Sequence, residues 1–462
     1  MTYILEKASE SKPLILEEEK IIKEPIEKDF NIIFCLDISG SMSSNTKIAG
    51  SKTLKYIKEK NSPTRLECVK IAIDSQILQL VQSNPNSNVG FVFFEDSIHV
   101  YGDCSSQRKI YSGKILENYQ EILDEADYIA QKCMKFPIKN SCTTMLQSLK
   151  EINTKGCTAL GPGLLFSLGL AKNGKRGSKI IICTDGLANK GLGIVETEDS
   201  NIIEKSKEYY NQIGLLAKEY GIVISVISLV DSECRLDMLS PIADLTGGNI
   251  VRVDPSKLSE DFSNCLNDVL VATKVRFEVR IDKYFEFSNV LVGQLSKDNS
   301  CLCREVGNAT RDTMITFEYR IKTKEILKKM NLADLQEIKF CHIQTSIFYE
   351  NMKGWKCMKV LSKNYEITRN EEELEQERDS IVMGSHFQQV ASLLSMKGDY
   401  NSATYYIGES LKANKEDKKI LNKLTPINHA LKMQSATYEL NKQNDMLTSE
   451  INQAFKSPTK NA

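Results

Sequence analysis

Length, composition and charge already exclude several classes of protein. The chain has 462 residues, of which 41% are hydrophobic and 26% charged, and its 60 Lys and Arg nearly cancel its 61 Asp and Glu. This composition is typical of a globular protein of about three domains. A net charge of −1 gives no overall field that would favour nucleic acid or an anionic membrane, so we expect no nucleic-acid partner.

Two further features bear on the cellular compartment. The longest dense apolar run, residues 222–230, is far shorter than the ~20 residues that span a bilayer, and the first residues show no apolar stretch of a secretory signal. The 13 cysteines are odd in number and scattered, and several lie inside apolar runs, as Cys35 and Cys183 do. This pattern predicts buried free thiols. We therefore expect a cytoplasmic protein without a membrane span.

In chain order, the first change of pattern comes near residue 29. Residues 1–28 are a charged segment with short apolar pieces, which we interpret as strands of a later sheet. From 29 to 272, buried apolar runs such as 31–36 and 178–183 alternate with stretches whose apolar residues recur every three or four positions. This alternation predicts an α/β domain with a doubly wound, mostly parallel sheet.

Two polar stretches interrupt this domain. Residues 45–61 are rich in lysine, and residues 105–155 read as polar helices without a continuous apolar stripe. We interpret both as insertions outside the core. Because surface loops tolerate changes of length at small entropic cost, we expect residues 105–155 to be dispensable for folding.

Beyond residue 272 the apolar period changes from 3.6 to 2. Apolar and charged residues alternate over 275–281 and in later segments, which predicts an antiparallel β-sandwich for residues 273–369. Residues 370–456 follow as a helical region, and 457–462 as a disordered tail. The last predicted helix places five apolar residues on one stripe, namely Ala436, Leu440, Leu447, Ile451 and Phe455.

Polar residues that can carry chemistry lie on loops after buried strands. Asp37, Ser39 and Ser41 follow the first central strand, Asp185 follows the fourth, and Thr158 lies in a glycine-containing loop before a helix. In the doubly wound order 3-2-1-4-5-6, the first and fourth strands are neighbours, and ligands bind at their carboxyl ends. The expected strand order therefore brings Asp37 and Asp185 together.

Two carboxylates and three hydroxyls form an oxygen-only set that suits a hard divalent cation. We predict that Asp37, Ser39, Ser41, Thr158 and Asp185 bind Mg²⁺, with Mn²⁺ or Ca²⁺ as alternatives, since no His or Cys draws the site toward zinc or copper. These ligands supply only two negative charges, which leaves a position for an external carboxylate. Taken singly, each residue also has a structural interpretation as a helix cap or a turn.

The three loops resemble those of a von Willebrand factor A domain with an intact metal-ion-dependent adhesion site. The segments that carry the resemblance are DISGS, GCTALGPGL and IIICTDG, within residues 30–270. The order of A domain, β-sandwich and helical region also resembles, in architecture, the inner-coat subunits of COPII vesicles. It is similar as well to A-domain proteins of ubiquitin-ligase and Ro-type RNA-binding contexts. The resemblance implies binding of protein partners.

Two functional hypotheses follow from this pattern. The first is an intracellular protein-binding module that engages an Asp or Glu of a partner protein through the Mg²⁺-loaded site. The alternative is a coat-like or structural scaffold, in vesicle trafficking or ubiquitin-pathway assembly, that does not use the metal for binding. We expect no enzyme, because a phosphatase of the aspartyl-phosphate type needs a carboxylate at the position of Ser39.

Overall fold

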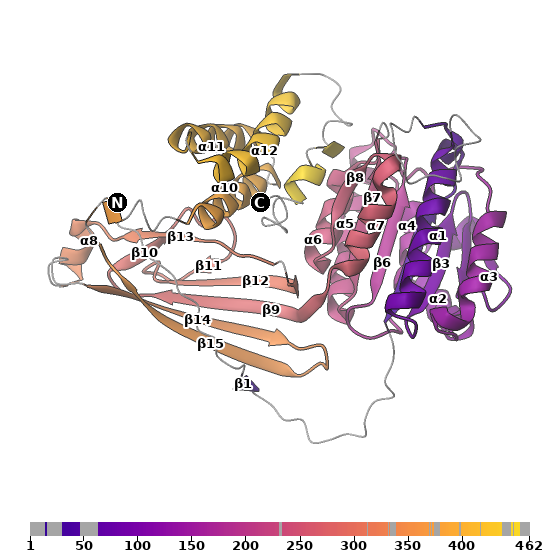
Figure 1. Cartoon of the computed structure of the whole chain (residues 1–462), viewed down its shortest axis with the longest axis horizontal. Helices are drawn as coiled ribbons and strands as arrows, with labels where there is room; N and C mark the ends of the chain where they lie inside the picture. The colour runs from indigo at the N-terminus through magenta and orange to yellow at the C-terminus, as the bar shows by residue number, and fades with distance from the viewer. Residues whose placement is uncertain are drawn as a thin grey trace. The chain divides into compact units, whose positions relative to one another are not determined.

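The structure is a computed structural model, and the chain divides into two compact units (Figure 1). The α/β unit comprises Ile22–Leu270 and Ala436–Gln453, and the β unit comprises Met1–Ile21, Val271–Ser435 and Ala454–Ala462. The residues that the structure describes are 14–15, 30–46, 63–230, 233–311, 313–330, 332, 339–368, 370, 372–373, 379–396, 399–415, 417–436, 445–446 and 448–452. Within these ranges no helix has the length and apolar character needed to cross a membrane.

A seven-stranded sheet with the order β5-β4-β3-β2-β6-β7-β8 forms the centre of the α/β unit. Its parallel strands are β2 (Asn31–Asp37), β3 (Asn88–Phe94), β6 (Lys179–Thr184), β7 (Val223–Leu229) and β8 (Ile250–Val253). At one edge, β4 (Ile98–Gly102) and β5 (Lys109–Tyr111) run antiparallel. Every residue of β2, β6 and β7 is buried, as expected for strands covered on both faces. The predicted doubly wound sheet is confirmed.

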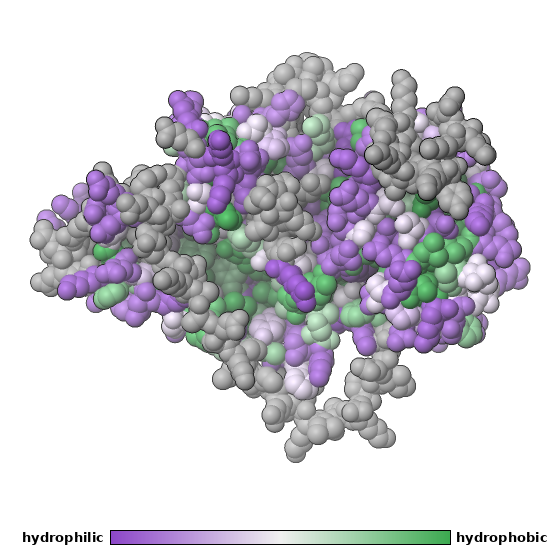
Figure 2. Space-filling model, viewed as in Figure 1, coloured by the Kyte–Doolittle hydropathy of each residue, from purple (hydrophilic) through white to green (hydrophobic). Residues whose placement is uncertain are grey.

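Helices cover both faces of this sheet (Figure 1). One core contains residues of α2 (Tyr119–Cys133), α4 (Leu160–Ala171), α5 (Ser200–Tyr220) and α6 (Leu236–Thr246). The opposite core contains residues of α1 (Arg65–Ser83), α3 (Ile138–Glu151) and α7 (Leu258–Asn267). Short 3-10 turns lie at Gly40–Ser43, Gly113–Glu117 and Pro255–Lys257. Toward the viewer, hydrophilic side chains surround smaller hydrophobic patches on the surface of this unit (Figure 2).

The prediction that residues 105–155 lie outside the core is wrong. Ile122 and Ile129 of α2 are buried in one core, and Met145 and Leu149 of α3 are buried in the other. The stripes are short, and many of the residues between their apolar positions are polar, so the sequence does not show them as one continuous pattern. Each helix nevertheless covers one face of the sheet, and we now expect loss of this region to expose both cores.

The β unit contains a six-stranded antiparallel sheet, β1-β15-β14-β9-β12-β11, and the two-stranded sheet β10-β13. Its strands are β1 (Leu14–Ile15), β9 (Leu270–Ile281), β10 (Phe285–Ser288), β11 (Gln294–Leu295), β12 (Cys301–Thr310), β13 (Glu318–Ile321), β14 (Phe340–Glu350) and β15 (Lys356–Glu366). Buried and more exposed residues largely alternate along β9, and aromatic side chains of β9 and β10 share a core. The predicted antiparallel domain is confirmed.

The remaining helices follow or interrupt these strands. They are α8 (Lys324–Lys329), α10 (Ser380–Met396), α11 (Tyr400–Ala413) and α12 (Lys418–Ala436), and the chain is helical again at 445–446 and 448–452. Leu14 and Ile15 pair with β15. The rest of 1–28, residues 47–61 and the tail 457–462 lie outside the described residues, so the predictions made for them stay predictions, as do the domain boundaries.

Candidate functional site

The predicted site residues lie at the carboxyl edge of the α/β sheet. Asp37 ends β2, and Asp185 follows the last residue of β6. These two strands are parallel neighbours in register, with Leu36 opposite Cys183. The two carboxylates therefore leave the sheet side by side, as the expected strand order required.

Hydrogen bonds join the residues that follow β2 and β6. The Ser41 hydroxyl donates to Asp185 Oδ1 at 2.6 Å, and the Ser39 and Ser41 hydroxyl oxygens are 3.0 Å apart. Asp37 accepts from the Thr184 hydroxyl at 2.6 Å and from the Ser39 backbone amide at 2.8 Å. Oxygen atoms from two loops thus form a continuous polar cluster.

Thr158 comes from a third loop and reaches the same place. A Cβ atom at Gly186 would lie 3.5 Å from the Ser41 hydroxyl oxygen and 3.7 Å from that of Thr158. The Thr158 loop is held there because its amide donates to Asn189 Oδ1 at 2.8 Å. The structure therefore brings all five predicted residues together, while their role as metal ligands stays a prediction.

Burial makes this cluster electrostatically unusual. Asp37 is fully buried and Asp185 is 3% exposed, and Ser39 and Thr158 are buried as well, whereas Ser41 is exposed. Burial raises the pKa of Asp37 to about 6, and the negative charge of Asp185 adds to the effect. Two neighbouring acids with little water around them favour a cation close by.

Arg65 supplies the positive charge that this structure places beside Asp185. Its Nη1 lies 2.7 Å from Asp185 Oδ2, and the Arg65 side chain is 14% exposed. Arg65 is the first residue of α1, and a capping box fixes that turn: Thr64 Oγ1 accepts from the Glu67 amide, and Glu67 Oε2 accepts from the Thr64 amide. Sequence reasoning missed Arg65, although the T-x-x-E capping pattern could have located it at the helix start.

The donor set fits a hard divalent cation. Among the described residues no group of three or more His, Cys, Asp and Glu side chains could hold a metal ion, so an ion here would be bound by two carboxylates, hydroxyls and water. Mg²⁺ accepts such ligands and retains several waters. The pairing of a guanidinium with Asp185 shows that the site accommodates a positive charge.

The two acids that directly follow β3 already have other partners. Glu95 pairs with His99 at 3.0 Å and with Lys155 at 3.5 Å, and Asp96 pairs with Lys190 at 3.3 Å. These two carboxylates are therefore not candidates for the metal set. The amide of Cys157 donates to Asp96 Oδ1 at 3.1 Å. The Cys157 side chain is exposed, so the general prediction of buried thiols is wrong at this cysteine.

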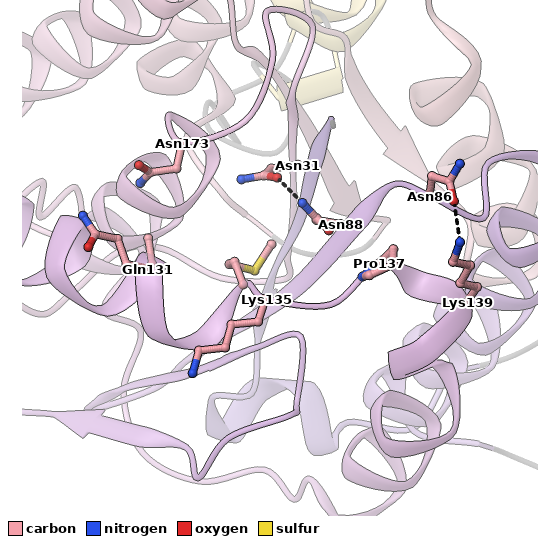
Figure 3. Close-up of a pocket in the computed structure, with 10 residues that line it drawn as sticks. Asn31, Asn86, Asn88, Gln131, Lys135, Pro137, Lys139 and Asn173 are labelled. Carbon is pink, nitrogen blue, oxygen red and sulfur yellow. Dashed lines mark hydrogen bonds between the residues drawn. The ribbon is translucent and has the colours of Figure 1, made fainter. Parts of the chain in front are cut away.

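A polar pocket of about 680 Å³ lies at the opposite, amino edge of the same sheet (Figure 3). Five carboxamide side chains line it, those of Asn31, Asn86, Asn88, Gln131 and Asn173. In Figure 3 dashed lines join Asn88 to Asn31 (3.3 Å) and Lys139 to Asn86 (2.8 Å). The pocket is separated from the five-residue cluster by the full length of β2, because Asn31 begins that strand and Asp37 ends it.

Comparison with known proteins finds a family match over part of the chain and a shared fold with one solved structure. Residues 58–270 match the Sec23/Sec24 trunk domain. The human COPII-coat protein Sec24c, a solved structure, has a TM-score of 0.58 to this chain at 12% identity, covering 92% of this chain and 57% of that one. This likeness shows a shared fold, in agreement with the predicted resemblance to COPII inner-coat subunits.

Two curated relatives also match this chain, and in each of them the match covers less than half of the relative's length. "Circularly permutated Ras protein 1" of Dictyostelium discoideum is 23% identical over 393 residues, which cover 82% of this chain and 44% of the relative. "Protein transport protein SEC24-2" of Naumovozyma castellii is 23% identical over 297 residues, covering 59% and 31%. The chain thus spans less than half the length of either relative.

Proposed function

We propose that this chain is a coat-like protein-binding scaffold whose α/β unit engages an acidic group of a partner protein through a divalent cation. The observation that carries the proposal is the convergence of five oxygen-bearing side chains around the buried pair Asp37 and Asp185. The match of residues 58–270 to the Sec23/Sec24 trunk domain supports the scaffold part.

Each residue has a distinct role in this proposal. Asp37 and Asp185 supply the two negative charges, and the hydroxyls of Ser39, Ser41 and Thr158 orient the ion directly or through water. Ser41 is exposed while the other four are buried, so the ion is approached from the Ser41 side. An Asp or Glu of the partner completes the coordination there. Mg²⁺ is the preferred ion, with Mn²⁺ or Ca²⁺ as alternatives.

Arg65 makes the site conditional on metal concentration. Its guanidinium and a divalent ion compete for the same Asp185 carboxylate, because two cations within a few ångströms repel each other. Metal entry therefore requires Arg65 to turn away from Asp185. Once released, the guanidinium is available to the carboxylate of the partner.

We also propose a cytoplasmic location. All 13 cysteines of the chain lie among the described residues, and all are free. Thiols that stay unpaired are typical of a reducing compartment.

A passive scaffold is the second candidate, and the same ion pair favours it. If Arg65 holds Asp185 permanently, the negative charge is already balanced and partners bind elsewhere on the chain. In that case the adhesion-type cluster only stabilises the loops at the carboxyl edge.

Affinity capture in Mg²⁺ and in EDTA separates the two candidates. The bait is the full chain, in wild-type form and as Asp185→Ala, with Asp124→Ala as the control because Asp124 is exposed on α2. We expect partners that are retained by the wild type and by Asp124→Ala in Mg²⁺, and that are lost in EDTA and with Asp185→Ala. Equal recovery under all conditions would leave only the passive scaffold.

A further inference from the structure

The first turn of α6 is capped by a residue far away in the sequence. Arg235, which precedes α6, adopts a left-handed conformation and makes no side-chain cap. Instead Asp445 accepts hydrogen bonds from the backbone amides of Cys234 and Leu236, both at 2.6 Å. A carboxylate at this position satisfies amides that a helix cannot bond internally and interacts favourably with the helix dipole.

The same segment also occupies the open side of β8. β8 is the last strand of its sheet, and its other side pairs with β7. The Ile250 amide donates to Asn452 Oδ1 at 2.9 Å, and the Arg252 amide donates to Ser449 Oγ at 3.0 Å. Ser449 in turn donates to the Ile250 carbonyl at 3.3 Å. These are the backbone groups that a further strand would bind at an edge.

The three polar residues share one face of a short helical segment. Asp445, Ser449 and Asn452 are separated by four and three positions, which places them above one another on a helix. Asp445 is fully buried, Ser449 is 4% exposed and Asn452 is 1% exposed, whereas Met446 is 39% exposed. Asn452 Nδ2 also donates to Asp244 Oδ1 of α6 at 2.8 Å. Asp445, Ser449 and Asn452 therefore each hold the segment through hydrogen bonds to backbone groups.

One feature of the contact opposes binding. Glu450 Oε2 is buried and has no hydrogen-bond partner among the described residues, and burial raises the pKa of Glu450. A buried carboxylate oxygen without a hydrogen-bond partner carries a desolvation cost. The segment thus makes hydrogen bonds to its surface at three positions and leaves a buried oxygen unbonded at Glu450. This balance suits a contact that opens and closes.

We infer that the β8 edge and the first turn of α6 form a second protein-binding site, specific for a helix with the pattern Asp-x3-Ser-x2-Asn, and that the chain's own segment with Asp445, Ser449 and Asn452 occupies it in cis. The site recognises the helix by its own backbone amides at Cys234, Leu236, Ile250 and Arg252. The cis segment excludes any other helix of this pattern until it is displaced. This inference does not depend on metal binding at the carboxyl edge.

Binding of a synthetic peptide tests the inference directly. The probe is a fluorescent peptide of residues 441–456, and the receptors are the full wild-type chain and a full-length triple variant, Asp445→Ala/Ser449→Ala/Asn452→Ala. We expect the triple variant to bind the peptide at least ~10-fold more tightly than the wild type, because its own segment no longer competes. A peptide with Met446→Ala should bind like the original, and a peptide with the three alanines should not bind.

Hydrogen exchange of the same two proteins provides the second readout. We expect the amides of residues 234, 236, 250 and 252 to exchange faster in the triple variant, while those of β6 and β7 stay protected and show that the unit is folded. If the triple variant does not fold, the Asn452→Ala single variant replaces it in both measurements. The inference is overturned if the peptide fails to bind the variant receptor, or if the alanine peptide binds equally well.

Discussion

Asp37 in the α/β unit and two acids of the β unit, Glu318 and Asp298, meet opposite conditions. In the α/β unit, Asp37 is fully buried beside Asp185, and burial raises its pKa to about 6. In the β unit, the pKa of Glu318 is lowered to about 2, chiefly by His386, and the pKa of Asp298 is lowered to about 2 by the hydroxyls of neighbouring serines. Donors of the β unit thus satisfy these two acids. At the carboxyl edge of the α/β unit, Arg65 pairs with Asp185 while Asp37 is buried beside the same acid, and for this reason we propose that a further cation binds at that edge.

Removing one acid at the carboxyl edge should lower the affinity for the metal ion, and this is the largest effect that we expect. Asp37→Ala takes away half of the formal charge of the site, and a charge pair at 4 Å is worth about 4 kcal/mol at an effective dielectric constant of 20. We expect affinity for Mn²⁺, followed by electron paramagnetic resonance, to fall by at least ~100-fold. Ser39→Ala should weaken it less, because it removes a neutral ligand.

The matched control for this loss lies in the β unit. Glu318→Ala removes an acid that already has partners, since Ser288 and Asn289 each donate to it at 2.9 Å. It should leave Mn²⁺ affinity unchanged. A similar loss in both variants would show that the ion binds without regard to the carboxyl edge, and the contrast between the units would then have no functional meaning.

Changing Arg65 should raise the affinity for the metal ion, by less than Asp37→Ala lowers it. Arg65→Gln removes the guanidinium that competes for Asp185, and a hydrogen bond between charged groups is worth about 1.5 kcal/mol. We expect Mg²⁺ to bind ~10-fold more tightly. Arg320→Gln, which breaks the 2.9 Å pair with Glu286 in the β unit, is the control and should change nothing. Unaltered affinity in Arg65→Gln would mean that Arg65 does not occupy the ion's place.

Lowering the pH should remove the stability that Glu318 contributes to the β unit, and this is the smallest effect that we expect. Because the folded-state pKa of Glu318 is about 2 and its ordinary value is 4.5, its contribution to stability is present above pH 4.5 and is lost as the pH falls through 2. The carboxylate is 40% exposed, so solvent screens it and we expect only ~0.5 kcal/mol. Thermal unfolding of wild type and Glu318→Gln should therefore differ at pH 6 and converge near pH 2. A gap that persists in acid would contradict this assignment.

The five-residue cluster was predictable because its information is local. Each member directly follows a buried strand or opens a loop before a helix, and the strand order of a doubly wound sheet then brings the loops together. Arg65 was missed because its partner, Asp185, lies 120 positions away. Nothing in the pattern around Arg65 indicates which carboxylate it meets.

The contacts of the segment that covers the β8 edge were harder to predict, for a different reason. The interpretation of the last helix followed its apolar stripe, which includes Ile451, and Ile451 is indeed buried. The contacts that hold the segment are made by Asp445, Ser449 and Asn452 to backbone amides. Backbone amides are present in every sequence, so a surface made of them leaves no trace in composition or periodicity.

Calorimetric titration of Mg²⁺ into the wild-type chain tests the central claim most directly. If the carboxyl edge holds a cation, the titration saturates at one ion per chain, and the heat disappears in Asp185→Ala while Asp124→Ala behaves as the wild type. If the wild type takes up no ion, or if Asp185→Ala binds as well as the wild type does, the cluster is not a metal site. The chain would then be a scaffold whose partners bind elsewhere.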